Sequence, residues 1–97
     1  MPLTPKQNRY LRGLAHTLKP VVMVGGAGIS AGVINETANS LAHHELIKVR
    51  ISGLDRNERQ QSAAYLAEQT QSELVTLIGH IAVLYRAAKK PQIKLPA

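Results

Sequence analysis

The stretch VVMVGGAGISA, residues 21–31, decides the fold of this chain. Residues 21–24 form a continuous apolar run, which is typical of a short strand that is buried on both faces. Glycines then end the strand, and Ser30 is placed to cap a helix that continues to about His43. The side chains expected to face inward along this helix are Val33, Ile34, Thr37, Ala38 and Leu41. A strand, a glycine loop and a helix in this order indicate an α/β fold.

An amphipathic helix is predicted upstream, over residues 5–18. Thr4 followed by Pro5 is an N-cap and first-turn signal, and Pro20 ends the helix. At about 100° per residue, the apolar and basic residues fall on opposite sides. The apolar side holds Tyr10, Leu11, Leu14, Ala15 and Leu18, and the basic side holds Lys6, Arg9, Arg12 and His16. Because the basic side carries no acid, we interpret it as a contact surface.

Residues 46–51 are predicted to form a second strand, because apolar and basic residues alternate along them. Lys48 and Arg50 share one face of this strand and point together toward solvent. Asp55 and Glu58 have the spacing of a capping box for a third helix, which continues to about Thr70. The expected inward residues of that helix are mostly small, so it should lie close to the sheet: Ala63, Leu66, Ala67 and Thr70.

Two apolar runs, residues 74–78 and 81–85, are separated by Gly79 and His80, which predicts a two-residue hairpin. Helical connections between the earlier strands require parallel pairing, whereas the hairpin is antiparallel. The chain is therefore predicted to be one α/β domain, residues 1–97, with three helices and a four-stranded mixed sheet in the order α-β-α-β-α-β-β. Residues 87–97 are predicted to be an extended basic tail that docks through Ile93 and Leu95.

Positive charge is concentrated at the two ends of the chain. The net charge is +6, from 12 Lys and Arg against 6 Asp and Glu. Residues 1–20 and 86–97 hold four bases each and no acid, so that every acid lies within residues 21–85. This segregation favours a polyanionic partner, although basic ends also simply keep small proteins in solution.

Composition limits the function further. The chain has three Tyr and neither Phe nor Trp, which argues against the base-stacking platforms of RRM and OB domains and leaves mainly backbone contacts to a nucleic acid. Without Cys there is no disulfide, thiolate zinc site or cysteine nucleophile. The longest apolar run, residues 81–85, is too short to cross a bilayer, and residues 1–6 lack the apolar region of a secretory signal. We expect a cytoplasmic protein with no membrane contact.

The glycine loop fits three interpretations. Residues 26–31 match the dinucleotide pattern GxGxxA, but no acid lies near Ile51, where that pattern needs one, and the domain is short. Gly25 and Gly28 also form a GxxG loop, with Gly26 and Ala27 inside it, of the kind that clamps a nucleic-acid backbone. The glycines alternatively just make a tight turn. The motif alone does not choose between these interpretations.

Five features of the chain, taken together and in this order, resemble the YhbY family, the stand-alone bacterial form of the CRM domain. They are the basic first helix, the strand at residues 21–24, the GxxG loop, the stretch HHELIKVR at residues 43–50 and the closing LYR at residues 84–86. This resemblance implies a fold similar to the C-terminal domain of translation initiation factor three. It also implies RNA binding and association with precursors of the large ribosomal subunit. The candidate RNA-binding residues are Lys6, Arg9, Arg12, Lys19, Gly25, Gly26, Ala27, Gly28, Lys48, Arg50 and Arg86.

Two positions depart from the family pattern. Gly26 and Ala27 place no polar side chain inside the loop, and His80 stands where relatives often carry Lys. The loop should therefore bind RNA more weakly and the first helix should contribute more. We expect the helix cations and the glycine loop to lie on a common surface.

No catalytic or metal site is predicted, because the titratable residues do not converge. His43 and His44 are adjacent at a helix end and point in different directions, and Ser30 has no His or Asp partner nearby. We therefore expect a non-enzymatic protein without a cofactor, monomeric when free, whose partners are ribosomal RNA and pre-50S particles. The alternatives are a nucleotide-binding enzyme or sensor that uses the glycine loop, and an adaptor for an acidic protein.

Overall fold

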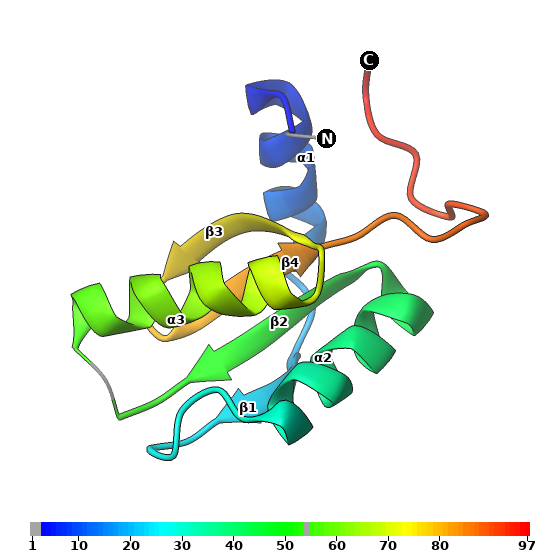
Figure 1. The fold of residues 1–97 in the computed structure, drawn as a ribbon. Helices are drawn as coiled ribbons and strands as arrows, with labels where there is room; N and C mark the ends of the chain where they lie inside the picture. The colour runs from blue at the N-terminus through cyan, green and yellow to red at the C-terminus, as the bar shows by residue number, and fades with distance from the viewer. Residues whose placement is uncertain (1–2, 54) are drawn as a thin grey trace.

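The computed structural model describes residues 3–53 and 55–97 (Figure 1). Met1, Pro2 and Leu54 lie outside the described residues. Met1 and Pro2 belong to the segment in which we expected no secretory signal. The elements follow the predicted order: α1 Pro5–Ala15, β1 Pro20–Val24, α2 Ala31–His44, β2 Leu46–Ile51, α3 Arg56–Gln69, β3 Glu73–Ile78 and β4 Ile81–Tyr85. No helix in the described ranges is long and apolar enough to span a bilayer.

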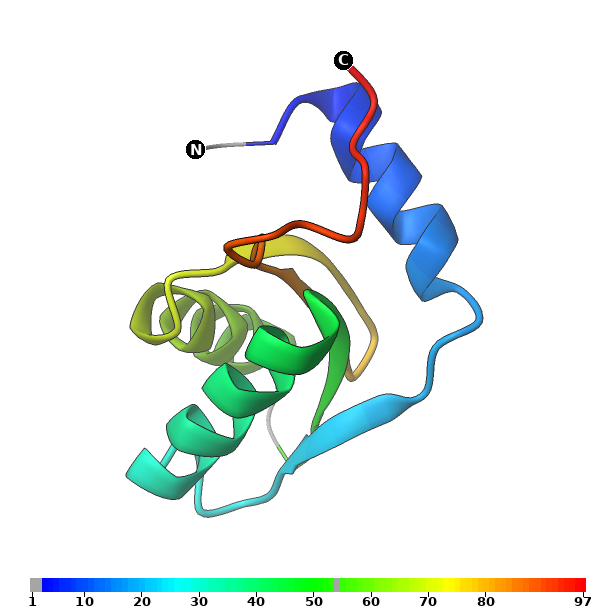
Figure 2. The ribbon, with the colours of Figure 1, turned by 90° about the vertical axis from the view of Figure 1, so that its right-hand side faces the viewer.

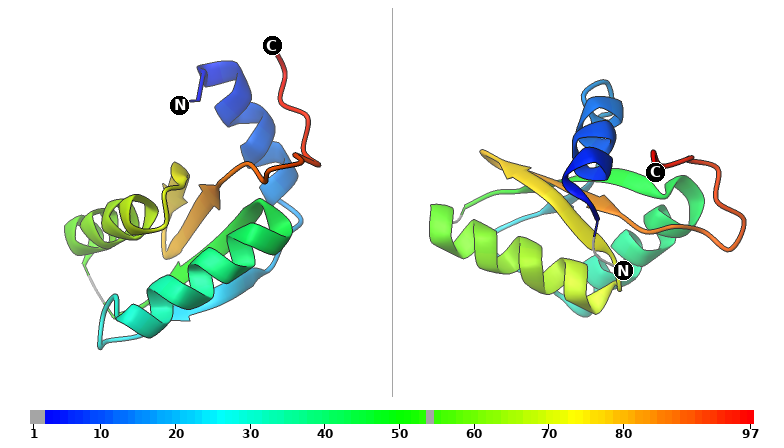
Figure 3. Two further views of the ribbon diagram at one scale, coloured as in Figure 1. Left: turned by 45° about the vertical axis from the view of Figure 1, so that its right-hand side comes forward. Right: turned by 90° about the horizontal axis from the view of Figure 1, so that it is seen from above.

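The four strands form one mixed sheet with the order β1-β2-β4-β3. β1 and β2 are parallel and the β3–β4 hairpin is antiparallel, as predicted. β4 also pairs antiparallel with β2, a pairing that the sequence did not predict. Figure 2 and the right-hand view of Figure 3 show α1 on one face of the sheet and both α2 and α3 on the other. The domain therefore has three layers, with the sheet in the middle.

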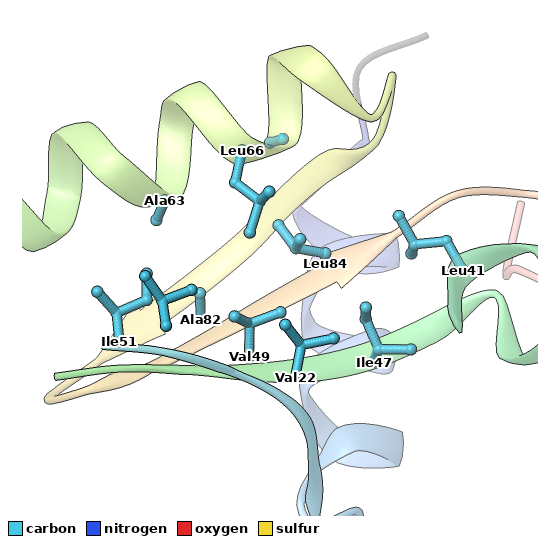
Figure 4. Close-up of a cluster of buried hydrophobic side chains, with 11 residues drawn as sticks. Val22, Leu41, Ile47, Val49, Ile51, Ala63, Leu66, Ala82 and Leu84 are labelled. Carbon is cyan, nitrogen blue, oxygen red and sulfur yellow. The ribbon is translucent and has the colours of Figure 1, made fainter. Parts of the chain in front are cut away.

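The larger core lies between the sheet and the α2–α3 layer (Figure 4). β2 contributes Ile47, Val49 and Ile51, the three residues that its alternation placed on one face. α3 contributes Ala63, Leu66 and Ala67, as predicted, and Thr70 is buried as well. The other members are Val22, Val24, Leu41, Ala82 and Leu84.

A smaller core lies under α1, on the opposite face of the sheet. Leu11 and Ala15 pack there against Leu46, Val75, Val83 and Tyr85. Leu3, Ile93 and Leu95 pack against the same cluster, which confirms that the tail docks through its two aliphatic residues. α1 covers only part of this face, because it stands over one end of the sheet (Figure 2).

Two sequence predictions about burial and helix length are wrong. α1 ends at Ala15 rather than Leu18, because Pro20 disfavours helical backbone before it and the N–H groups of His16 and Leu18 donate to carbonyls only three residues back. Leu18, beyond the end of the helix, is 39% exposed, and Tyr10 and Leu14, which were expected to face inward, are 42% and 38% exposed. β1 is not buried on both faces. It is an edge strand that α1 does not cover, and Val21 and Met23 are 45% and 67% exposed.

The predicted helix caps are confirmed. Thr4 and Gln7 form a reciprocal capping box on α1, and the Ser30 hydroxyl accepts a hydrogen bond from the Val33 N–H. On α3 the Asp55 carboxylate accepts from the Glu58 N–H at 2.8 Å. Each cap satisfies a backbone donor that the first helical turn leaves open.

The tail is held by a buried carboxylate, which the sequence did not reveal. Glu45, the residue after α2, is 3% exposed and has a positive φ of 63°. Its side-chain oxygens accept hydrogen bonds from the N–H groups of Ala88, Gln92 and Ile93 at 2.9, 2.8 and 3.0 Å. Burial raises the pKa of Glu45, but these three donors outweigh burial, and the net pKa lies below its ordinary value.

Candidate nucleic-acid interface

The glycine loop is a tight turn between β1 and α2. The Gly28 N–H donates to the Gly25 carbonyl at 3.0 Å. Gly28 has a φ of +80°, a backbone conformation that is strained for any residue with a side chain. At Gly25 and Gly26, by contrast, φ is not positive and an added Cβ would meet nothing within 4 Å. The fold therefore requires glycine at position 28 and not at positions 25 and 26.

A second loop supports the glycine loop from behind. The Ser52 N–H donates to the Val24 carbonyl at 3.0 Å, which ties the end of β2 to the end of β1. Gly53 has a φ of +79°, and a Cβ there would lie 3.7 Å from the Gly26 Cα. Gly25, Gly26 and Ala27 themselves are exposed. The loop is thus held in place while its outer side stays open to a ligand.

The basic residues of α1 are exposed, and Arg12 reaches the sheet. Lys6, Arg9 and Arg12 recur every three residues and so follow one side of the helix. Arg12 and His16 line a groove of about 200 Å³ together with Lys48 of β2. The Lys48 Nζ donates a long hydrogen bond of 3.5 Å to the His16 carbonyl. The end of α1 and the middle of β2 therefore share one basic surface.

The α1 cations and the glycine loop, which we expected on a common surface, are not adjacent to each other. Figures 1 and 2 place α1 beyond one end of β1 and the loop at the other end. β2 connects them, because Lys48 and Arg50 alternate with its buried residues and lie on the α1 side of the sheet. Arg50 is exposed and pairs in register with Met23, two residues before Gly25.

The acids lie mostly in the other layer. Glu36 lies on α2, Asp55, Glu58 and Glu68 belong to α3 and its cap, and Glu45 is buried under the tail. The sixth acid, Glu73, lines a separate pocket beside Leu3 and Thr4 near the start of α1. The sequence has no acid in residues 20–28 or 46–53, so the path from α1 to the loop carries only positive charge.

Two of the candidate residues point elsewhere. Arg86 is half-buried, and its guanidinium donates to the Thr70 carbonyl at 2.9 Å and to the Ala38 carbonyl at 3.0 Å. It therefore braces α2 against the end of α3, and we leave it out of the interface. Lys19 lines a different groove of about 450 Å³ with Leu14 and Leu18, at the β1 edge.

Arg86→Ala is expected to lower the free energy of unfolding by about 2 kcal/mol, because two carbonyl acceptors lose a charged donor. The RNA affinity of the folded variant should stay unchanged. Urea unfolding followed by RNA titration below the transition checks both statements. A variant as stable as the parent but weaker in RNA binding would instead return Arg86 to the interface.

No metal site is apparent in residues 3–53 and 55–97, where no three His, Cys, Asp or Glu side chains come together. The ring of His43 hydrogen-bonds the Asn39 carbonyl one turn earlier at 2.8 Å. This contact agrees with a structural role for His43 at the end of α2.

Comparison with known proteins gives one consistent result. The family model of the CRS1 / YhbY (CRM) domain matches residues 3–86. A Haemophilus influenzae protein named "RNA-binding protein" is 48% identical over 94 residues, which cover 97% of this chain and 95% of that one. The Bacillus subtilis "Probable RNA-binding protein YqeI" is 39% identical over 97% of this chain and 99% of its own length.

A solved structure confirms the fold. The solution structure of a Staphylococcus aureus protein superposes with a TM-score of 0.87 at 41% sequence identity, and the match covers 98% of this chain and all of that one. The names of the relatives describe RNA-binding proteins rather than enzymes. On the strength of the family model, these relatives and the shared fold, the chain belongs to the CRS1 / YhbY (CRM) domain family.

Proposed function

We propose that this protein binds ribosomal RNA in precursors of the large ribosomal subunit and assists their assembly. The observation that carries the proposal is a continuous basic path. It runs from Arg9 and Arg12 over Lys48 and Arg50 to a loop whose first two glycines the fold does not require. We further propose that the protein acts in the cytoplasm, is monomeric when free and needs no cofactor.

The loop suits a phosphate for two reasons. It precedes the N-terminus of α2, where the helix dipole and unpaired N–H groups favour an anion. The missing side chains at Gly25 and Gly26 let a ribose-phosphate chain approach the backbone closely. The cations along α1 and β2 then hold the phosphates on either side, which gives affinity with little dependence on sequence.

Co-sedimentation with ribosomal particles tests the proposal. We expect the protein to sediment with large-subunit precursors and to be released by RNase. If it neutralises about four to six phosphates, the logarithm of the affinity should fall with the logarithm of salt concentration at a slope near minus three to minus five. RNase-resistant sedimentation with a flat salt response would mean that the partner is a protein.

Arg9→Ala/Arg12→Ala should weaken RNA binding about tenfold and make the salt slope less steep by about two, because two phosphate contacts are lost. Both side chains are exposed, so the melting temperature should change little. Lys89→Ala/Lys90→Ala removes the same charge from the tail and serves as the matched control. Equal losses in the two variants would show that net charge, and not the α1 surface, determines binding.

A further inference from the structure

One part of the sheet face on the α1 side has no helix over it (Figure 2). There Met23, Arg50, Ile81 and Ile78 stand in register across all four strands. Met23 and Ile78 are 67% and 69% exposed, the highest values among the large apolar side chains of the described residues. We call these four residues the open row. The most exposed apolar groups of the domain are thus gathered in one line.

The open row lies between the two ends of the proposed interface, which are the basic groove and the glycine loop. On one side, Ile78 and Ile81 line the groove that Arg12, His16 and Lys48 also line. On the other side, Met23 leads through Val24 into the glycine loop. The apolar side chains therefore have cations on the groove side and the exposed backbone of the glycine loop on the other side, and Arg50 stands among them.

We infer that the open row receives unpaired nucleobases, so that the RNA bound here is single-stranded at this surface; this rests on the proposed function. A duplex turns its phosphates and 2′-hydroxyls to a protein and keeps its bases stacked inside, where an apolar row cannot reach them. An unpaired base offers an apolar face, which buries the aliphatic side chains, and its plane stacks on a guanidinium such as that of Arg50.

Charge favours RNA over an apolar protein partner. An apolar protein surface would cover Met23 and Ile78 equally well, but residues 20–28 and 46–53 carry Lys48 and Arg50 and no acid. A strand of RNA supplies an apolar base and an anionic phosphate at every nucleotide, which is the alternation that this surface presents. Phosphates at the glycine loop and at Arg12 with Lys48 would place the intervening bases over the open row.

Binding of two RNA probes tests the inference. An unstructured 12-nucleotide RNA and a blunt 12-base-pair duplex containing it are titrated by fluorescence anisotropy at one salt concentration. We expect the single strand to bind at least about tenfold more tightly than the duplex. Equal or tighter binding of the duplex overturns the inference but leaves the proposed function standing, whereas failure of both probes to bind removes the proposed function itself.

Met23→Ser/Ile78→Ser should weaken single-strand binding roughly fivefold to tenfold and leave duplex binding unchanged. Tyr65→Ser, which removes a 47% exposed side chain from α3 on the other layer, is the matched control and should bind like the parent. Equal losses on both probes would overturn the inference. A further measurement needs no variant: base protons of the single strand should show nuclear Overhauser contacts to the Met23, Ile78 and Ile81 methyl groups, and their absence in a saturated complex would contradict it.

Discussion

Glu45→Ala is expected to lower the free energy of unfolding by about 3 kcal/mol and to release the C-terminal tail. The Glu45 carboxylate accepts from three backbone N–H groups of residues 88–93, and hydrogen bonds to a charged group contribute about 1.5–3 kcal/mol each. In the variant the tail can leave the surface, and water then hydrates the three N–H groups. The loss of stability is therefore smaller than the sum of the three hydrogen-bond contributions. Urea unfolding measures the loss of stability.

Release of the tail is measured separately. In the parent, Ile93 and Leu95 pack on the core under α1, and Gln7 donates to the Pro96 carbonyl at 3.1 Å. In the variant, trypsin should cleave after Lys89 much faster; Lys90 is followed by Pro91, which blocks cleavage there. Glu68→Ala removes an exposed carboxylate from α3 and should change neither stability nor cleavage. A tail that stays protected in Glu45→Ala would show that its apolar residues hold it without the carboxylate.

A fall in pH should weaken the attachment of the tail to Glu45. Because the folded-state pKa of Glu45 is lowered from 4.5, its stabilisation is fully present above that value and is lost as the pH falls through the lowered folded pKa. Glu45→Gln cannot titrate, so the stability difference between parent and variant should shrink from pH 6 toward pH 3. A difference that stays constant over this range would mean that the carboxylate's charge does not hold the tail.

Gly26→Asp should reduce RNA affinity about thirtyfold without unfolding the protein. An added Cβ meets nothing within 4 Å, the position is exposed and φ is not positive there, so we expect the fold to tolerate the substitution. The Asp side chain keeps an RNA phosphate away from the loop backbone, and the negative charge of the carboxylate repels the phosphate. Each effect weakens the binding free energy by roughly 1 kcal/mol.

Gln61→Glu is the matched control for this variant. It makes the same change in net charge at an exposed position of α3, in the opposite layer. We expect its RNA affinity to stay within about twofold of the parent, since screening weakens charge effects beyond about 10 Å. Parent-like binding by Gly26→Asp would remove the glycine loop from the interface and leave the interpretation of the glycines as a simple turn.

The sequence predicted those features that local patterns determine. Alternation along β2 correctly placed Ile47, Val49 and Ile51 on one face, because the side-chain period of a strand is two. Gly79 sits where the hairpin requires a positive φ, and its φ is +59°. The element order and the mixed sheet follow from these local patterns together with the rules for strand connections.

The failures depended on contacts between distant residues. Arg86 had the appearance of an exposed basic strand residue, but its partners are 16 and 48 residues away in the sequence. Glu45 holds a tail that begins more than 40 residues later, and no spacing rule connects them. The exposure of Met23 follows from the position of β1 at the edge of the sheet. The apolar pattern of one strand does not predict the order of the strands in the sheet.

The path from α1 over β2 to the glycine loop is tested most directly by mapping RNA contacts on the native protein. Amide chemical shifts are recorded while an unstructured RNA from large-subunit ribosomal RNA is added. We expect the largest changes at Arg12, Lys48, Arg50 and residues 25–28, with little change on the outer sides of α2 and α3. Changes confined to the α2–α3 layer would contradict the proposed interface.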